Sequence, residues 1–192
     1  YLFCHKDPYI VLTNTNYILI KIMMLPKPRK INVEKYIGGL SKIEKISDPI
    51  KLSANESALG PSPKAIKVFE KHKNKIFKYP ESDSNNLREE ISKKYNIDFN
   101  RIVCGAGSDQ IFDLICKSFL QTGDEVIVSE FGFIMHRIYA SLHGAKIFLA
   151  KEEKYRVSIE EILKKVSDKT KIVFIANPNN PTGTYLSKRE ML

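Results

Sequence analysis

Short apolar segments alternate with amphipathic helical segments between residues 101 and 176, and this alternation limits the possible folds more than any other feature of the sequence. Each apolar segment has four to six residues, a length that suits a buried strand. Strands that alternate with helices in this way predict βαβ units, and therefore an α/β fold with a largely parallel sheet covered by helices on both faces. The predicted strands are 101–104, 125–129, 145–150 and 171–176.

Helix boundaries in this region are marked by glycine and by capping residues. Gly123 and Gly144 each follow an apolar periodic segment, at the place where glycine commonly ends a helix. Ser158 and Glu161 have the spacing of a capping box, which predicts a helix with its apolar face formed by residues 159–166. The predicted helices between the strands contain residues 111–120, 133–142 and 159–166.

The part of the chain before residue 101 predicts an extended arm and two helices. The pattern from 26 to 58 is irregular and interrupted by Pro and Gly, which indicates an arm with at most one short helix. Ser62 and Pro63 then predict a helix to about Lys73, because Ser caps a helix and Pro suits the first helical position. Apolar residues every four positions from Leu87 predict a second helix at about 86–95.

The two ends of the sequence suggest how the protein is organised. The sequence starts without Met, so we expect translation to begin at Met23 or Met24, with a short membrane-peripheral tail as the alternative. A capping box that begins at Ser187 opens a helix just before the sequence stops, so we expect the front part of a longer protein. The expected domains are a tail at 1–23, an arm with part of a small domain at 24–75, and the first part of a large domain at 76–192.

Composition and charge exclude several classes of protein. The hydrophobic content of 43% and the charged content of 28% are those of a globular protein. The net charge of +9 comes from lysines spread along the chain, so we expect no nucleic-acid partner. Three cysteines without a paired spacing favour reduced thiols and a cytoplasmic location. No apolar run is long enough to cross a membrane, and we expect no metal site.

The sequence CGAGSDQ, residues 104–110, lies between a predicted strand and a predicted helix. Gly105 and Gly107 allow a tight turn, and Ser108 and Asp109 then occupy a helix N-terminus, where free N–H groups attract an anion such as phosphate. The alternative is that Ser108 or Asp109 simply caps the helix. A dinucleotide site is disfavoured because Gln110 stands where a further glycine would be needed.

The sequence NPNNPTG, residues 177–183, follows the last predicted strand. Proline fixes its own φ angle and keeps the preceding residue extended, so two Asn-Pro steps predict a rigid loop that aims asparagine side chains. Asn180 precedes Pro181 and is a candidate for a cis peptide bond. Ligands of parallel α/β sheets bind at the carboxyl ends of the strands, which is where this loop and the 104–110 loop would lie. The alternative is an ordinary turn that ends a strand.

Four segments together resemble the fold-type I aminotransferases, which use pyridoxal 5′-phosphate, and most of all their histidinol-phosphate branch. NPNNPTG at 177–183 resembles the signature loop of that family, and LSANESALGPSPKA at 52–65 resembles its NENPxGPSP segment. KYPES at 78–82 resembles its YPD or YPE loop, and GAGSDQ at 105–110 resembles its GxGSDE phosphate loop. The resemblance covers about residues 30–192 and corresponds to roughly the first half of such an enzyme. It implies a fold-type I PLP-dependent transferase.

The resemblance implies a set of cofactor-binding residues. Ser108, Asp109 and Gln110 would lie at the cofactor phosphate and bind it mostly through backbone N–H groups, with Gln110 in place of the family's usual Glu. Phe133 would stack on the pyridine ring, with ordinary helix packing as its alternative role. Asn180 would donate a hydrogen bond to the 3′-oxygen of the cofactor.

Further residues would act across a subunit interface or on the substrate. Tyr79 would reach the phosphate bound in the partner subunit of a homodimer, the usual assembly of the family, with a surface tyrosine as the alternative. Tyr36 and Asn55 match positions where the family meets its substrate. No residue among the 192 matches the family's Schiff-base lysine, so no catalytic residue is predicted and this chain alone is expected to be inactive.

The resemblance implies a reaction for the full-length protein. The expected activity is transfer of an amino group between histidinol phosphate and 2-oxoglutarate, with glutamate as the other amino acid, in histidine biosynthesis. The alternatives are an aromatic-amino-acid aminotransferase, a phosphothreonine decarboxylase, or a half-length protein that binds phosphate without catalysis. The first half of the enzyme does not separate these activities.

Overall fold

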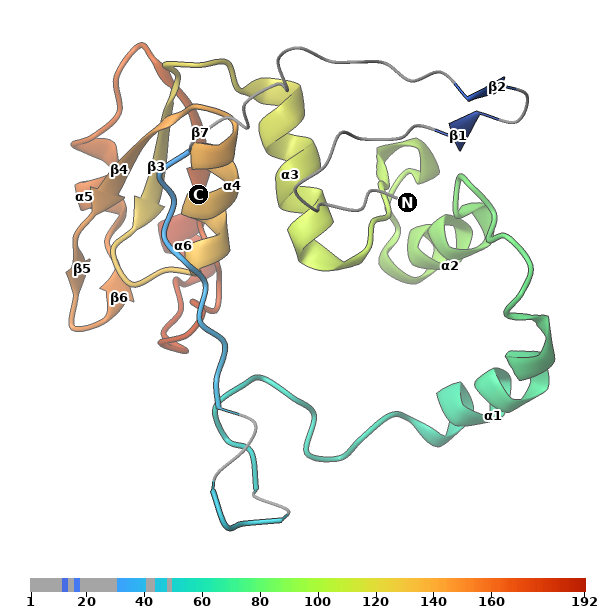
Figure 1. The fold of residues 1–192 in the computed structure, drawn as a ribbon. Helices are drawn as coiled ribbons and strands as arrows, with labels where there is room; N and C mark the ends of the chain where they lie inside the picture. Colours follow the sequence, from blue (N-terminus) through green and yellow to red (C-terminus); the bar gives the residue numbers. More distant parts are fainter. Residues whose placement is uncertain (1–11, 14–15, 18–30, 41–43, 48–49) are drawn as a thin grey trace. The chain divides into compact units, whose positions relative to one another are not determined.

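The computed structural model describes residues 12–13, 16–17, 31–40, 44–47 and 50–192 (Figure 1). The chain divides into two compact units, Tyr1–Asn32 and Val33–Leu192. In the first unit, strand β1 (Leu12–Thr13) pairs with strand β2 (Asn16–Tyr17) in an antiparallel arrangement. Most of the tail expected at 1–23 lies outside the described residues, as do both expected start residues, Met23 and Met24.

A three-stranded parallel sheet organises the second unit. The strands are β3 (Glu125–Ser129), β4 (Lys146–Ala150) and β7 (Thr170–Phe174), in the order β4-β3-β7. Val126 of β3 is paired with Ile147 on one side and with Ile172 on the other. The predicted parallel sheet is therefore confirmed, and its strands agree with the predicted segments to within two residues at each end.

Both faces of the central strand β3 are buried, as the alternating side chains of a strand allow. Val126 and Val128 join one apolar cluster with Cys116 of helix α3 (Gly107–Phe119) and Ala140 of helix α4 (Ile134–Leu142). Ile127 points to the other face. It joins a second cluster, which includes Ile162 of helix α5 (Ile159–Leu163). Helices thus cover both faces of the sheet, as the sequence predicts.

The predicted strand at 101–104 is wrong. A short 3-10 helix, η2 (Phe99–Arg101), occupies its start, and Ile102 then continues in an extended conformation. No strand of the described residues pairs with Ile102–Cys104, and Val103 is 72% exposed. A strand requires a neighbour to accept and donate its backbone hydrogen bonds, and an apolar sequence alone does not supply one.

The helix predicted at 159–166 is shorter than expected. The Ser158 hydroxyl accepts a hydrogen bond from the N–H of Glu161, as a capping residue should, but α5 ends at Leu163. Val166 is 51% exposed. Because Val166 has little apolar surface to pack against, tertiary contacts do not extend the helix to it.

A β-hairpin after β4 was not predicted. Strands β5 (Glu152–Glu153) and β6 (Arg156–Val157) pair through a turn in which both central residues, Lys154 and Tyr155, have positive φ angles of 51° and 62°. Such two-residue turns usually contain Asn or Gly, which tolerate positive φ. The Lys-Tyr pair gives no such signal, so the sequence did not indicate the hairpin.

The remaining predicted helices are confirmed. They are α1 (Pro63–His72), α2 (Asn85–Tyr95), α3, α4 and α6 (Lys188–Met191). A 3-10 helix that was not predicted, η1 (Lys73–Lys75), follows α1. The Ser62 hydroxyl caps α1 by accepting from the N–H of Ala65 at 3.2 Å, and the Ser187–Glu190 capping box opens α6. In the part of the chain that the structure describes, no helix is both long enough and apolar enough to cross a membrane.

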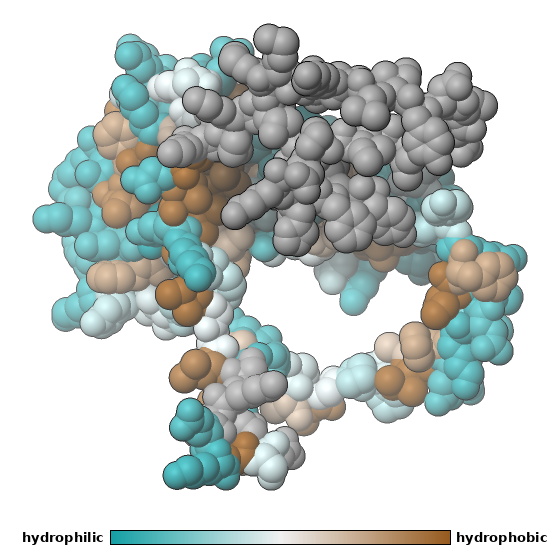
Figure 2. All heavy atoms as spheres, viewed as in Figure 1, coloured by the Kyte–Doolittle hydropathy of each residue, from teal (hydrophilic) through white to brown (hydrophobic). Residues whose placement is uncertain are grey.

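Several apolar side chains of α1 lie on the surface. Ile66, Val68 and Phe69 are 43%, 58% and 62% exposed, and α1 buries no residue within the described chain. Figure 2 shows brown, hydrophobic side chains along this helix. Exposed apolar groups on one helix indicate a surface that another element or chain covers.

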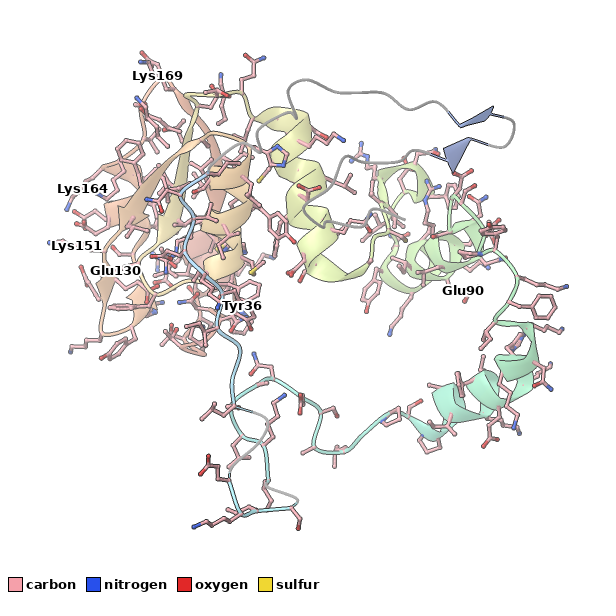
Figure 3. All side chains as sticks on the ribbon, in the orientation of Figure 1. Tyr36, Glu90, Glu130, Lys151, Lys164 and Lys169 are labelled. Carbon is pink, nitrogen blue, oxygen red and sulfur yellow. The ribbon has the colours of Figure 1, made fainter. Side chains whose placement is uncertain are left out.

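We predict that Ile127→Ala destabilises the full-length protein by about 2–5 kcal/mol, because it leaves a cavity at the centre of the sheet. Chemical denaturation of the purified protein measures this change. Lys151→Ala is the matched control: Lys151 is exposed just beyond β4, and its side chain projects outward in Figure 3. An Ile127→Ala variant as stable as the control would contradict the role assigned to the central strand.

Candidate functional site

The candidate site lies at the carboxyl end of the sheet. Strands β3 and β7 run parallel, and Val128 near the end of β3 is paired with Phe174 at the end of β7. The segments that leave these strands, residues 130–133 and 175–186, therefore start at the same edge. These segments carry Phe133 and Asn180, which are two of the predicted cofactor-binding residues.

An aromatic cluster joins α3, α4 and β7 at this edge. The imidazole of His136 stacks on the ring of Phe174, with centroids 4.8 Å apart and an interplanar angle of 8°. Phe112 meets the His136 ring edge-on at 4.6 Å, and Phe133 meets it at 5.8 Å. Phe133 also lies 6.3 Å from Phe112. The half-buried Phe133 ring thus packs at steep interplanar angles against two aromatic neighbours.

His136 belongs to the site although the sequence analysis did not select it. It is 6% exposed, and burial lowers the pKa of its imidazole below the usual value. The signal that could have found it is its position three residues after Phe133, because residues three apart lie on the same side of a helix. At neutral pH the buried ring is therefore an uncharged part of the aromatic cluster.

The loop after β7 uses its three asparagines in different ways. The Asn177 side chain closes the loop: its Nδ2 donates to the carbonyl of Leu186 at 3.0 Å, and its Oδ1 accepts from the N–H of Leu186 at 2.8 Å. Asn179 is 4% exposed, and its Nδ2 donates to Thr182 Oγ1 at 3.0 Å and to Glu152 Oε1 at 3.1 Å. No described residue forms a hydrogen bond with the Asn180 side chain.

Both proline bonds of this loop are cis. The Asn180–Pro181 bond is cis, as the sequence suggested, and the Asn177–Pro178 bond is cis as well. Backbone hydrogen bonds tighten the loop further, from Asn179 N–H to the carbonyl of Thr184 at 2.7 Å and from Gly183 N–H to the carbonyl of Asn179 at 2.8 Å. The loop is therefore an ordered structure in which the amide of Asn180 alone, among its three asparagines, remains available to a ligand.

The N-terminus of α3 has the features expected of an anion site. Neither Ser108 nor Asp109 caps the helix with its side chain, so the capping alternative does not hold. Among the described residues, no acceptor takes the backbone N–H of Ser108 or Asp109. Gly107 has a φ of +74°, and a Cβ atom there would meet nothing within 4 Å, so the backbone is open to a ligand.

The side chain of Gln110 makes a local contact, and its role at the phosphate through the backbone stays a prediction. Its Oε1 accepts a hydrogen bond from the N–H of Ala106, so the side chain folds back over the start of α3. Phe112 lies four residues after Ser108 and hence on the same side of the helix. Its contact with Phe133 brings the α3 N-terminus toward the aromatic cluster.

The other predicted residues lie on exposed segments. Tyr79 is fully exposed, Tyr36 is 54% exposed, and Asn55 is exposed. None of their side chains forms a hydrogen bond with a described residue, so their assigned roles stay predictions. Figure 3 shows Tyr36 on the arm that precedes α1. That arm is tied to α4 by an ion pair in which Glu34 Oε2 lies 2.9 Å from Arg137 Nε.

The model of the family "Aminotransferase class I and II" matches residues 47–192. The chain belongs to the class I and II aminotransferase family. The matched residues include the α3 N-terminus, the aromatic cluster and the Asn-Pro loop.

Curated relatives of this aminotransferase chain are named histidinol-phosphate aminotransferase. The relative from Pelagibacter ubique is 55% identical over 170 residues, which are 88% of this chain and 47% of the relative. The relative from Paramagnetospirillum magneticum is 42% identical over 166 residues, 86% of this chain and 46% of the relative. The chain therefore spans about half the length of the curated relatives that it matches.

Solved aminotransferase structures have the same fold. The histidinol-phosphate aminotransferase from Sinorhizobium meliloti, solved in complex with pyridoxal-5′-phosphate, has a TM-score of 0.68 at 23% identity, over 72% of this chain and 38% of that chain. An aromatic aminotransferase from Pyrococcus horikoshii has a TM-score of 0.60 at 26% identity, over 67% and 38% of the two chains. The predicted fold-type I architecture is confirmed by these neighbours.

We predict that the full-length protein loses stability as the pH falls from 7.5 to 5.5, in part because of His136. Its pKa in the folded state is lowered from 6.5, so the unfolded state binds more protons in this range and is favoured as pH falls. The loss should level off below the folded-state pKa. Denaturation of wild type and His136→Phe at both pH values tests this. The variant should lose less stability than wild type, and equal losses would contradict the assignment.

Proposed function

We propose that the full-length protein is a histidinol-phosphate aminotransferase that depends on pyridoxal 5′-phosphate. The observation that carries the proposal is the Asn-Pro loop, in which Asn177 and Asn179 hold the loop together while the Asn180 amide stays free at the sheet edge that also carries Phe133. The names of the curated relatives support the same activity.

The described residues fit the cofactor at its phosphate and at its ring. The free N–H groups of Ser108 and Asp109 at the positive end of α3 suit the phosphate, with Gln110 ordering the turn through its bond to Ala106. The half-buried ring of Phe133 can stack on a planar heterocycle. When bound, the cofactor serves as an electron sink for the carbanion formed at the amino acid.

Asn180 would act on the electronic state of the cofactor. A neutral amide N–H that donates to the 3′-oxygen stabilises the ionised form of that oxygen without adding a positive charge. Because the loop is closed by Asn177 and Asn179, the Asn180 amide can be held in one orientation before the ligand arrives. Preorganised donors of this kind need little rearrangement when they bind.

We place histidinol phosphate and 2-oxoglutarate as substrates, in the cytoplasm, and a homodimer in which Tyr79 reaches the phosphate of the partner subunit. The exposed apolar side chains of α1 and the fully exposed Tyr79 support such an interface. Tyr36 and Asn55 would contact substrate. An aromatic-amino-acid aminotransferase is the second candidate, favoured by the structural likeness to the Pyrococcus horikoshii enzyme.

We predict that the full-length protein transfers the amino group of L-histidinol phosphate to 2-oxoglutarate. The kcat/KM for histidinol phosphate should be at least about 100-fold above that for phenylalanine or tyrosine, because a buried phosphate contact is worth several kcal/mol. A coupled assay for glutamate measures both reactions. A preference for the aromatic amino acids would favour the second candidate, and a cofactor-loaded protein inactive on all three would contradict both.

We predict that Asn180→Ala moves the pH titration of the visible absorbance of the bound cofactor to higher pH by about one unit, because the lost donor no longer favours the ionised oxygen. Absorbance spectra of the full-length protein between pH 5 and 10 measure the shift. Asn74→Ala, an exposed asparagine of η1 without a described side-chain hydrogen bond, is the matched control. A titration identical to that of the control would remove Asn180 from the cofactor site.

A further inference from the structure

One carboxylate connects the two loops that carry Phe133 and Asn180. Glu152 is the first residue of β5, just after strand β4 ends at Ala150. Its Oε1 accepts the backbone N–H of Phe131 at 3.3 Å and the side-chain Nδ2 of Asn179 at 3.1 Å. Phe131 belongs to the segment after β3, and Asn179 belongs to the loop after β7. A single oxygen atom thus holds both loops.

The contact of Glu152 joins segments that follow the two outer strands of the sheet. Strand β4 lies on one side of β3, and β7 lies on the other. Glu152 follows β4, so its side chain reaches past the carboxyl end of the central strand to the loop of the far strand. The backbone supports this placement, because the N–H of Glu130 donates to the carbonyl of Ala150 at 2.9 Å.

The same amide nitrogen of Asn179 that Glu152 holds is also oriented by two threonines. Thr184 Oγ1 donates to the carbonyl of Tyr155 at 2.7 Å, so Thr182 Oγ1, 3.0 Å away, donates to Thr184. Thr182 Oγ1 is then an acceptor and takes its hydrogen bond from Asn179 Nδ2. This chain fixes which end of the Asn179 amide faces Glu152, and Asn180 is the next residue.

The hydrogen bonds of Glu152 and Asn179 leave two buried polar atoms without a partner among the described residues, so they add little to the overall free energy of unfolding. Glu152 Oε2 and Asn179 Oδ1 are both buried, and no described residue donates to either atom. Buried polar atoms without partners carry a cost that an apolar contact would avoid. The arrangement is effective as a geometric clamp, because one acceptor oxygen fixes the spacing of two loops. Its neighbour Glu153 is exposed and forms no side-chain hydrogen bond with a described residue.

We propose that Glu152 is a positioning residue that sets Phe133 and Asn180 at the spacing required to bind one cofactor ring between them. This inference rests on the proposed function, because it assigns Glu152 a role toward the same cofactor. Glu152 acts through Phe131 and Asn179, and it does not itself touch the ring. A Gln at this position keeps an acceptor oxygen and should keep the clamp, whereas Ala removes it.

The first measurement needs no cofactor. Amide hydrogen exchange of the cofactor-free full-length protein is compared for wild type, Glu152→Ala, Glu152→Gln and the matched control Glu153→Ala. In Glu152→Ala, exchange at the Phe131 and Gly183 amides should be at least about tenfold faster, because their loops lose a shared anchor. Glu152→Gln and Glu153→Ala should stay within about twofold of wild type. Wild-type exchange in Glu152→Ala would overturn the proposal.

The second measurement separates positioning from a purely structural role. The dissociation constant of pyridoxal 5′-phosphate is measured for Glu152→Ala in the wild-type background and in the Asn180→Ala background. A positioning role predicts about tenfold weaker binding in the first background and a clearly smaller loss, about threefold, in the second, because Asn180 is already absent and only the placement of Phe133 is left to lose. Equal losses in both backgrounds would overturn it.

The two measurements also separate this inference from the proposed function. Wild-type protein that does not bind pyridoxal 5′-phosphate would contradict the proposed function and with it any role of Glu152 toward the cofactor, whatever the hydrogen exchange shows. Wild-type protein that binds the cofactor, with Glu152→Ala binding it equally well, would overturn the role of Glu152 and leave the proposed function standing.

Discussion

The parallel pairing of β3 with strands on both of its sides is the constraint on which the rest of the structure depends. A central strand satisfies its backbone hydrogen bonds through both neighbours, and its side chains can then be buried on both faces. Val126 and Ile127 are completely buried for this reason. Because the strands run in the same direction, their carboxyl ends meet at one edge, and the loops that leave this edge form the candidate site.

The site combines rigid polar loops with an aromatic cluster. The Asn-Pro loop is closed by the side chain of Asn177 and anchored by that of Asn179, so its order depends on hydrogen bonds that water would otherwise satisfy. The aromatic rings of Phe133 and Phe174 meet through the buried imidazole of His136. Phe133 and the Asn-Pro loop follow different strands, β3 and β7, and Glu152 forms the contact between these two loops.

Local signals in the sequence predicted most of the elements in this region. The apolar periodicity of α3 and α4 and the capping residues Ser62 and Ser187 were sufficient, because helices and caps are formed by residues close in sequence. The segment 102–104 was predicted wrongly because strand formation depends on a distant partner. The β5–β6 hairpin was missed because its turn residues, Lys154 and Tyr155, are not those that normally mark a two-residue turn.

The sequence by itself determined the fold class and the family motifs, because these depend on residue type and on short-range spacing. The resemblance of those motifs to the family then selected Ser108, Phe133 and Asn180 as candidate cofactor-binding residues. The tertiary structure decided which asparagine of the loop is free, which histidine joins the aromatic cluster and which carboxylate connects the two loops. These depend on contacts between residues up to 38 positions apart, such as His136 and Phe174, and on which polar groups find partners when the strands come together.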